Sequence, residues 1–485
     1  MKKIISQIIQ YLFVLLFAYA ALNKWLTFSE FQVQLGQSTL LHGYDGFLSY
    51  VILIVELLVA VALCIPKTRL VALYLSVFIM TAFTIYIYVV LHHTSMSTCA
   101  CTGIFEKMSF ETHLWFNLGF VILGIYGIYL ETTNKKATLK WVIGTVLAGI
   151  ALVALLFFTS KHESAQQQDF TRTFLSDPLE IDSEMVFQKN SFYIAGVDGD
   201  KIYLGDYDSP FVIIEVDMNT KKETTHIVDI DDKDLQFYSL KTKVLPPYFY
   251  LADGVSAVVL RGKLGEWYAK TISLNQSYFT AFMPMDSSRF ALRGVNGLTE
   301  QSELGILDIN AEQPLTPFPE LLKKQVDGLF DVDGMFSFSP KSKKLVYSYV
   351  YRNQYLVMDT NMKLMRTGTT IDTTSVAKIN SQRTEKGEIK MTNPDVSVNS
   401  RSVVHRDLLF NISNVMGKKE SHKEWRQVTV VDVYEIDNNR YIGSFYVNNQ
   451  SGIKLFDMAV TDTHLYGLFA QKMIRFALPN WLEAN

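Results

Sequence analysis

A helical membrane bundle followed by an all-β propeller is the fold that the sequence predicts. Up to about Ser160, long apolar runs alternate with short polar gaps, and no later run approaches the roughly 20 apolar residues that cross a bilayer. From Phe170 onward, short β-rich runs alternate with turn residues, as in all-β proteins. The length of 485 residues favours two or more domains. All 3 cysteines lie in the first part, so the second part must fold by core burial rather than by disulfides.

Five membrane-spanning helices are predicted in the first part. They cover residues 4–23, 46–65, 70–91, 113–130 and 141–159. The first is expected to be retained rather than cleaved as a signal peptide, because its apolar run is long and another span follows soon. The predicted domains are a four-helix membrane domain (1–132), a fifth spanning helix with a linker (133–160) and the β-rich domain (161–485).

The orientation is predicted from lysine and arginine in the short loops. These cations precede the first span and separate the second from the third and the fourth from the fifth: Lys2, Lys3, Lys67, Arg69, Lys135, Lys136 and Lys140. The other two loops are longer and hold fewer cations, Lys24 in one and Lys107 in the other. We therefore expect the N-terminus in the cytoplasm of a bacterial inner membrane and the β-rich domain in the periplasm.

Weak repeats in the second part predict a propeller of about six blades. Six units of about 50 residues each can be recognised, centred on 191–222, 248–272, 289–310, 335–363, 429–447 and 457–478. Each reads as strand, turn and strand, followed by a strand that ends in a polar turn. A large β-sandwich is the alternative.

Polar residues within the apolar spans are candidates for a site. Glu56 lies near the middle of the second span, where a carboxylate is costly and normally faces a partner inside the bundle. Lys24 follows the first span and could reach it. His113 and Asn117 are one helical turn apart, so they share a face of the fourth span. Glu56 either fixes helix packing or forms a proton or quinone-headgroup site.

Two cysteines in the loop between the third and fourth spans carry the clearest chemical signal. On the outer face, Cys99 and Cys101 could be oxidised and stay oxidised. Cysteines at this spacing can close a small, strained disulfide, which would be a good oxidant of other thiols. A redox pair is the preferred interpretation, and a structural pair is the second. The third is a copper or zinc site, with His92, His93 and Met96 as further ligands.

The net charge, the acidic run and the remaining histidines and cysteine indicate no further binding or catalytic site. The net charge of −3, without a basic stripe, excludes nucleic acid as an expected partner. The acidic run at 229–234 lacks the glycine of a calcium loop, and the histidines of the β-rich part show no ligand spacing. No catalytic constellation stands out there, and propellers more often bind than catalyse. Cys64, at the other end of the second span, is expected to be a buried small apolar residue.

Three stretches resemble the MauE/DoxX-like family of redox-associated membrane proteins: FAYAALNKWLTFSEFQVQLGQSTLL, VELLVAVALCIPKTRLVALYLSVFIMTAFTIYIYVVL and CACTGIFEKMSFETHLWFNLGF. The resemblance covers about residues 4–131 and implies a four-helix membrane bundle tied to thiol–disulfide chemistry in the envelope. It implies that Cys99 and Cys101 form the redox pair, with Lys24 and Glu56 on the family's polar positions. Thr102 and Gly103 replace the two glycines that often follow the cysteines. The β-rich part looks like the six-bladed, TolB-like propellers of envelope lipoproteins.

These observations together predict an inner-membrane thiol–disulfide redox-associated protein, similar to MauE-type maturation factors. Its periplasmic propeller would bind a partner or substrate protein, and a thioredoxin-like protein is a further expected partner. If it is a thiol–disulfide oxidoreductase, a quinone is the expected electron acceptor. The alternative is a non-catalytic envelope receptor or assembly protein, with the bundle as its anchor in the bilayer and the propeller as its binding module.

Overall fold

The computed structural model describes residues 2–38, 41, 44–93, 108–159, 167–175, 179–392 and 397–479. The chain divides into two compact units. One consists of Met1–Glu163 together with Ile379–Val396, and the other of Ser164–Lys378 together with Ser397–Asn485. We call them the helical unit and the propeller unit.

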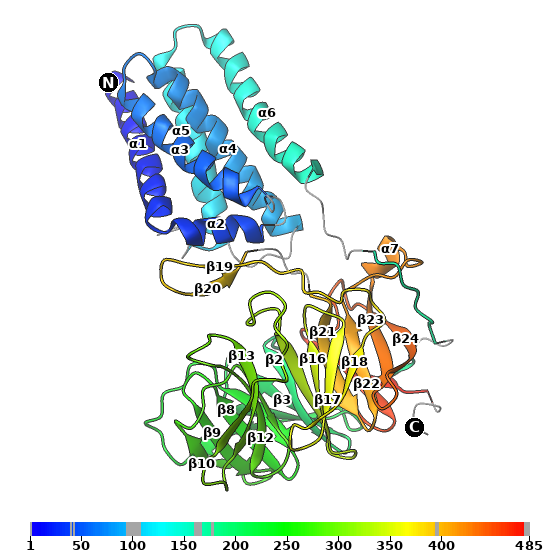
Figure 1. Ribbon diagram of the computed structural model, residues 1–485. Helices are drawn as coiled ribbons and strands as arrows, with labels where there is room; N and C mark the ends of the chain where they lie inside the picture. The colour runs from blue at the N-terminus through cyan, green and yellow to red at the C-terminus, as the bar shows by residue number, and fades with distance from the viewer. Residues whose placement is uncertain are drawn as a thin grey trace. The chain divides into compact units, whose positions relative to one another are not determined.

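Five helices in the helical unit are long and apolar enough to cross a membrane, so the predicted spans are confirmed (Figure 1). They are α1 (Lys2–Leu26), α3 (Asp45–Cys64), α4 (Arg69–His93), α5 (Phe110–Glu131) and α6 (Lys135–Thr159). A shorter helix that the sequence did not predict, α2 (Phe28–Gln37), follows α1. Within the bundle α1 packs against α3 and α5, and α4 packs against α5 and α6.

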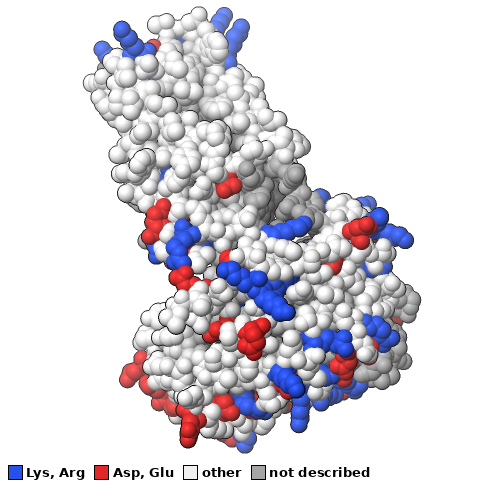
Figure 2. Space-filling model, in the orientation of Figure 1, with Lys and Arg blue, Asp and Glu red and all other residues white. Residues whose placement is uncertain are grey.

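Apolar side chains and small residues hold the bundle together. Phe13, Phe17 and Val77 are among its most buried side chains. A Cβ on Gly124 would come within 2.7 Å of Val77, so this glycine allows α5 to approach α4 and α1 closely. In Figure 2 the helical unit presents a surface almost free of charge, with lysines and arginines at one end. That end holds the loops that the sequence analysis identified as rich in cations.

The helical unit also contains a β-hairpin from the second half of the chain. Its strands are β19 (Ser381–Arg383) and β20 (Ile389–Met391), which pair antiparallel with each other only. The hairpin packs against α2.

The propeller unit consists of six sheets, each forming one blade. The first blade consists of β2 (Phe192–Asp198), β3 (Lys201–Asp206), β4 (Val212–Asp217) and β5 (Lys222–Ile227). The second consists of β7 (Lys241–Leu245), β8 (Tyr248–Asp253), β9 (Val258–Lys263) and β10 (Tyr268–Leu274), with the short strand β6 (Asp229–Ile230) at its edge. The third consists of β11 (Ala281–Pro284), β12 (Arg289–Val295), β13 (Ser302–Asp308) and β14 (Leu315–Phe318). The fourth consists of β15 (Gly334–Ser339), β16 (Lys344–Tyr349), β17 (Gln354–Met358) and β18 (Leu364–Thr369). The fifth is β21 (Asn399–His405), β22 (Leu408–Ser413), β23 (Val428–Glu435), β24 (Arg440–Asn448), and a short helix, α7 (His422–Trp425), precedes β23.

The sixth blade closes the ring with strands from both ends of the unit. Its strands β25 (Asp457–Val460), β26 (His464–Phe469) and β27 (Lys472–Ala477) are joined by β1 (Ile181–Val186), which pairs antiparallel with β27. The first strand of the unit therefore completes the last blade, which leaves no open edge between the two ends. Each of the six sequence repeats lies within one blade, so the predicted propeller is confirmed and the sandwich is excluded.

A buried arginine fixes the segment that leads into the propeller. Arg172 forms ion pairs with Asp432 at 2.8 Å and Glu420 at 2.6 Å, and its side chain is fully buried. Its guanidinium also donates to the Ser413 hydroxyl and the Val415 carbonyl. The desolvation that would lower the pKa of Arg172 is outweighed by the two carboxylates, which hold it above its ordinary value. The segment is thereby attached to the fifth blade.

Candidate functional site

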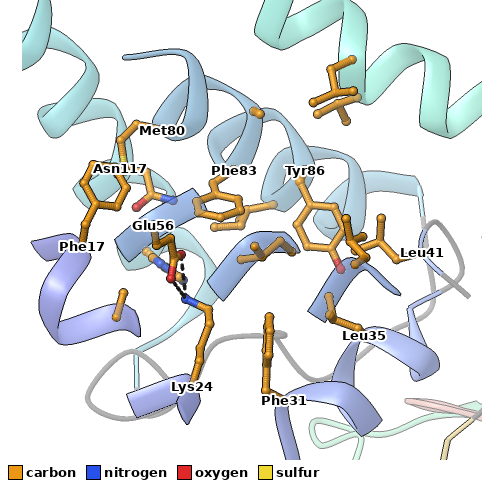
Figure 3. A pocket seen from close by; sticks show the side chains of 18 of the residues that line it. Phe17, Lys24, Phe31, Leu35, Leu41, Glu56, Met80, Phe83, Tyr86 and Asn117 are labelled. Atoms are coloured by element: carbon orange, nitrogen blue, oxygen red, sulfur yellow. Dashed lines mark hydrogen bonds and ion pairs between the residues drawn. The ribbon is translucent and has the colours of Figure 1, made fainter. Parts of the chain in front are cut away.

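A cavity of about 210 Å³ lies in the helical unit, at the end of the bundle opposite the cation-rich loops. All six helices of this unit contribute to its walls. The lining is largely aromatic and aliphatic, as Figure 3 shows, and includes Phe17, Phe31, Leu35, Met80, Phe83 and Tyr86. These apolar lining residues cannot be predicted from the sequence, because their spacing is the same as that of ordinary core residues.

Lys24 and Glu56 form an ion pair in the wall of the cavity (Figure 3). The Lys24 ammonium donates to both carboxylate oxygens of Glu56, at 2.8 and 3.0 Å. Glu56 is 2% exposed and Lys24 is 9% exposed, so both charges are withdrawn from water and from lipid. The Lys24 ammonium also lies 5.5 Å from the centre of the Phe31 ring, where a cation–π attraction adds to the pairing. A buried pair of this kind keeps charge inside a bundle without an uncompensated ion.

The other two predicted polar residues line the same cavity. His113 and Asn117 are both buried and come from the first turns of α5. The structure therefore brings together Lys24, Glu56, His113 and Asn117 from three helices of the bundle. Thr81 and Thr84, two polar residues of α4, donate instead to backbone carbonyls of their own helix.

Helix α2 closes one side of the cavity. Phe31 and Leu35 line the cavity. At the start of the helix, the Glu385 carboxylate of the hairpin accepts from both the backbone N–H and the hydroxyl of Ser29. Burial would raise the pKa of the Glu385 carboxyl, but these hydrogen bonds outweigh it and hold the pKa below its ordinary value.

Two further contacts hold the hairpin on α2. Lys386 pairs with Glu30 at 2.9 Å, and the Gln37 side-chain amide donates to the Met391 carbonyl at 2.7 Å. Gly36 lies directly under the hairpin backbone, where a Cβ would collide with the Thr392 carbonyl oxygen. A weak signal for α2 is present in the sequence, since apolar residues recur at Phe28, Phe31 and Leu35 at helical spacing, but the segment is too short to be recognised as a span.

Several predicted site residues lie outside the part of the chain whose side chains are described. They are Cys99, Cys101, His92, His93 and Met96. Helix α4 ends at His93 and α5 begins at Phe110, so the segment with the two cysteines leaves and rejoins the bundle at the end that holds the cavity. Among the residues that are described, no group of histidine, cysteine and acidic side chains is arranged to hold a metal ion.

Cys64 corrects one expectation from the sequence. It is the last residue of α3 and lies at the other end of the bundle, as predicted, but its side chain is exposed rather than buried. The buried face of this part of α3 is formed by Val59, Ala60 and Leu63. Cys64 is exposed because it ends the helix beyond these residues, and its thiol donates to the Ala60 carbonyl of its own helix at 3.5 Å.

Comparison with known proteins supports the division of the chain. Residues 2–130 match the family model of methylamine utilisation protein MauE. A comparison with curated proteins finds no match.

The propeller unit is similar to several solved structures at low identity. A member of the DUF4221 family from Bacteroides vulgatus shares 12% identity, with a TM-score of 0.42, over 64% of this chain and 98% of its own. A calcium-binding protein, regucalcin, from Agrobacterium tumefaciens shares 12% identity, with a TM-score of 0.36, over 65% of this chain and 97% of its own. A protein of unknown function from Bacteroides thetaiotaomicron shares 11% identity, with a TM-score of 0.38, over 65% and 73%. The stretch that matches the MauE family model, residues 2–130, lies within the helical unit, and the propeller unit has six blades.

Proposed function

We propose that this protein is a thiol–disulfide redox protein of the bacterial inner membrane, with its N-terminus in the cytoplasm and its propeller in the periplasm. The observation that carries the proposal is the buried Lys24–Glu56 pair in an apolar cavity, at the bundle end from which the segment with Cys99 and Cys101 leaves. A polar group in an apolar intramembrane cavity is a typical site for proton or headgroup chemistry. The match to the MauE family supports the assignment to thiol chemistry.

The proposed reaction transfers two electrons. A thiolate of the substrate protein attacks the Cys99–Cys101 disulfide and forms a mixed disulfide, and the second substrate thiol then resolves it. The substrate gains a disulfide, and the two cysteines of this chain become thiols. The two thiols must then be oxidised back to the disulfide, and a quinone held in the cavity would supply the oxidant for these two electrons and two protons. Lys24 and Glu56 would exchange protons at the cavity, with His113 and Asn117 positioning the quinone headgroup.

The proposal is tested by the redox state of the two cysteines in the native membrane. Free thiols are blocked with an alkylating agent before the protein is extracted, and mass spectrometry then compares reduced with unreduced peptides. We expect a reducible bond between Cys99 and Cys101. Free alkylation of both thiols in intact cells would contradict the redox role. In Cys101→Ser, the Cys99 thiolate can attack the disulfide of the oxidised substrate, and no neighbouring thiol remains to resolve the mixed disulfide, which should therefore pull down the substrate under non-reducing conditions. Cys64→Ser, which keeps both cysteines of the pair, serves as the matched control and should trap nothing.

The non-catalytic alternative makes the opposite prediction for the same cysteines. If the bundle only anchors a receptor or assembly propeller, the double variant Cys99→Ser, Cys101→Ser retains full function in the cell. Changes at the propeller channel would then abolish function. Loss of function in the double-serine strain, at unchanged protein level, supports the redox proposal.

A further inference from the structure

The six inner strands of the propeller unit surround a central channel. They are β2, β7, β11, β15, β21 and β25, and each packs against the next in this order, with β25 returning to β2. Two cavities, of about 420 and 490 Å³, lie along the channel. Four residues line both of them: Lys243, Met283, Phe336 and Arg401. These four residues, which we call the waist, mark the place where the two cavities meet.

The waist carries two cations, Lys243 and Arg401, and one carboxylate, that of Asp457, lies beside it. Lys243 belongs to β7 and Arg401 to β21, strands that are three places apart in the ring and therefore face each other across the channel. Arg401 pairs with Asp457 at 2.6 Å. The Asp457 carboxylate is further engaged by the backbone N–H groups of Ile194 and Met458.

Lys243 has no comparable partner. Among the residues that the structure describes, none forms a hydrogen bond or an ion pair with its ammonium. Burial, and then the charge of Arg401, lower the pKa of Lys243 to about 8, against the weaker opposing effect of Asp457. Lys241, on the same strand, adds a further repulsion. An anion beside Lys243 would stabilise the charged ammonium form of its side chain.

We propose that the waist binds a carboxylate that is carried on an apolar body. Two cations and one carboxylate leave one positive charge in excess, so the site suits a ligand with a single negative charge. Lys243 and Arg401 would contact this charge from opposite sides. Met283 and Phe336 provide apolar walls at the waist, and Phe282 with Tyr207 extend them along one of the two cavities. Two sources can supply this chemistry: a free small carboxylic acid, or the C-terminal residue of a peptide that enters the channel.

Calorimetry with the purified full-length protein tests the proposal, using 3-phenylpropionate as the probe and 3-phenylpropanol as its uncharged control. We expect the acid to bind about tenfold or more tightly than the alcohol, because the alcohol brings no negative charge to the two cations and its hydrogen bonds with them are weaker. Lys243→Met should remove this preference, whereas Lys270→Met, an exposed lysine on β10 of the same blade, should retain it. Equal binding of acid and alcohol, or an unchanged preference in Lys243→Met, overturns the proposal.

A second binding experiment, with a peptide, distinguishes the two sources of the carboxylate. The tripeptide Ala-Ala-Phe is compared with its C-terminal amide. Preference for the free carboxylate of the peptide over phenylpropionate identifies a protein terminus as the ligand, and the reverse order identifies a small acid. If neither carboxylate binds, the proposal is wrong.

Chemical labelling of the wild-type protein gives an answer even if Lys243→Met does not fold. An amine acylating reagent at pH 8 should modify Lys243, since about half of its side chains are unprotonated at a pKa of about 8. Phenylpropionate should protect Lys243 and leave Lys270 unchanged, and phenylpropanol should protect neither. Binding of the acid should weaken as the pH rises through about 8, where the ammonium loses its proton. Absence of protection would contradict the proposal.

Discussion

The Lys24–Glu56 pair is the residue-scale feature on which the bundle site depends. Each charge is stabilised in the bundle by the other, since Glu56 is almost fully buried and lies in the middle of a span. Removing one partner of a buried pair typically costs about 3–5 kcal/mol, whereas replacing both with apolar residues is often neutral. The pair could therefore serve packing or chemistry, and the two roles can be separated.

A double-variant cycle separates them. Lys24→Met and Glu56→Leu, each made alone, should destabilise the bundle by about 3–5 kcal/mol because an unpaired charge remains. The double variant should recover wild-type thermal stability in detergent but lose turnover of Cys99 and Cys101 in the membrane. Thr84→Val, which removes a hydroxyl that only bonds its own helix, is the control and should preserve both properties. Wild-type turnover in a stable double variant would show that the pair serves packing alone.

Arg172 allows a second prediction at this scale, for the propeller unit. Arg172→Met leaves Asp432 and Glu420 buried without a cation, so we expect a loss of about 3–5 kcal/mol. For a unit of this size, that corresponds to a fall in Tm on the order of 10 °C. Fluorescence of Trp425, whose ring lies 5.7 Å from the Arg172 guanidinium, can follow the transition.

The control for this experiment is Arg289→Met. Arg289 pairs with Asp286 at the surface of the same unit, where a salt bridge contributes at most about 1 kcal/mol. Its Tm should fall by much less than that of Arg172→Met. Similar Tm values for the two variants would mean that the buried network does not stabilise the propeller.

At the scale of elements, α2 and the hairpin are the parts of the fold that could not be predicted from the sequence. The five spans and six blades could be predicted, because long apolar runs and repeated β units carry strong periodic signals. Helix α2 is short, and its docking depends on residues about 350 positions away, such as Glu385 on Ser29. Lys24 and Glu56 could be predicted as site residues because a charge inside a membrane span is energetically costly. The apolar residues of the cavity wall could not, because nothing in the sequence distinguishes them from ordinary core residues. Long-range pairing of short elements is the information that a single sequence lacks.

Gly36 provides the test of the docked hairpin. Gly36→Ala places a Cβ against the Thr392 carbonyl oxygen, so the hairpin must move away from α2. We expect trypsin to cleave faster at Arg383 and Lys386, which lie in the hairpin. Gly144→Ala is the matched control, since a Cβ there meets no atom within 4 Å. Equal cleavage rates in the two variants would contradict the close packing of the hairpin on α2.

At the scale of the whole molecule, every functional role proposed for this chain depends on the two units lying in known compartments. In the proposed topology all five helices cross the membrane, which puts the chain after α6 on the side opposite the N-terminus. The exposed cations at one end of the bundle, including Lys67 between α3 and α4, favour a cytoplasmic location for that end. Cys99, Cys101 and the propeller would then share the oxidising compartment in which a disulfide persists.

Thiol labelling in intact cells tests this arrangement directly. In a background with Cys64, Cys99 and Cys101 replaced by serine, Lys67→Cys and Lys270→Cys each introduce one thiol at an exposed position. We expect a membrane-impermeant maleimide, applied after the outer membrane is opened, to label the thiol at 270 in the propeller at once. The thiol at 67 should react only after the inner membrane is lysed. Labelling of both thiols from outside would mean an even number of spans between positions 67 and 270, and labelling of 67 alone would mean the reverse orientation. The reverse orientation would place the cysteine pair and the propeller channel in the cytoplasm, and either result would contradict the topology on which the proposed oxidising role depends.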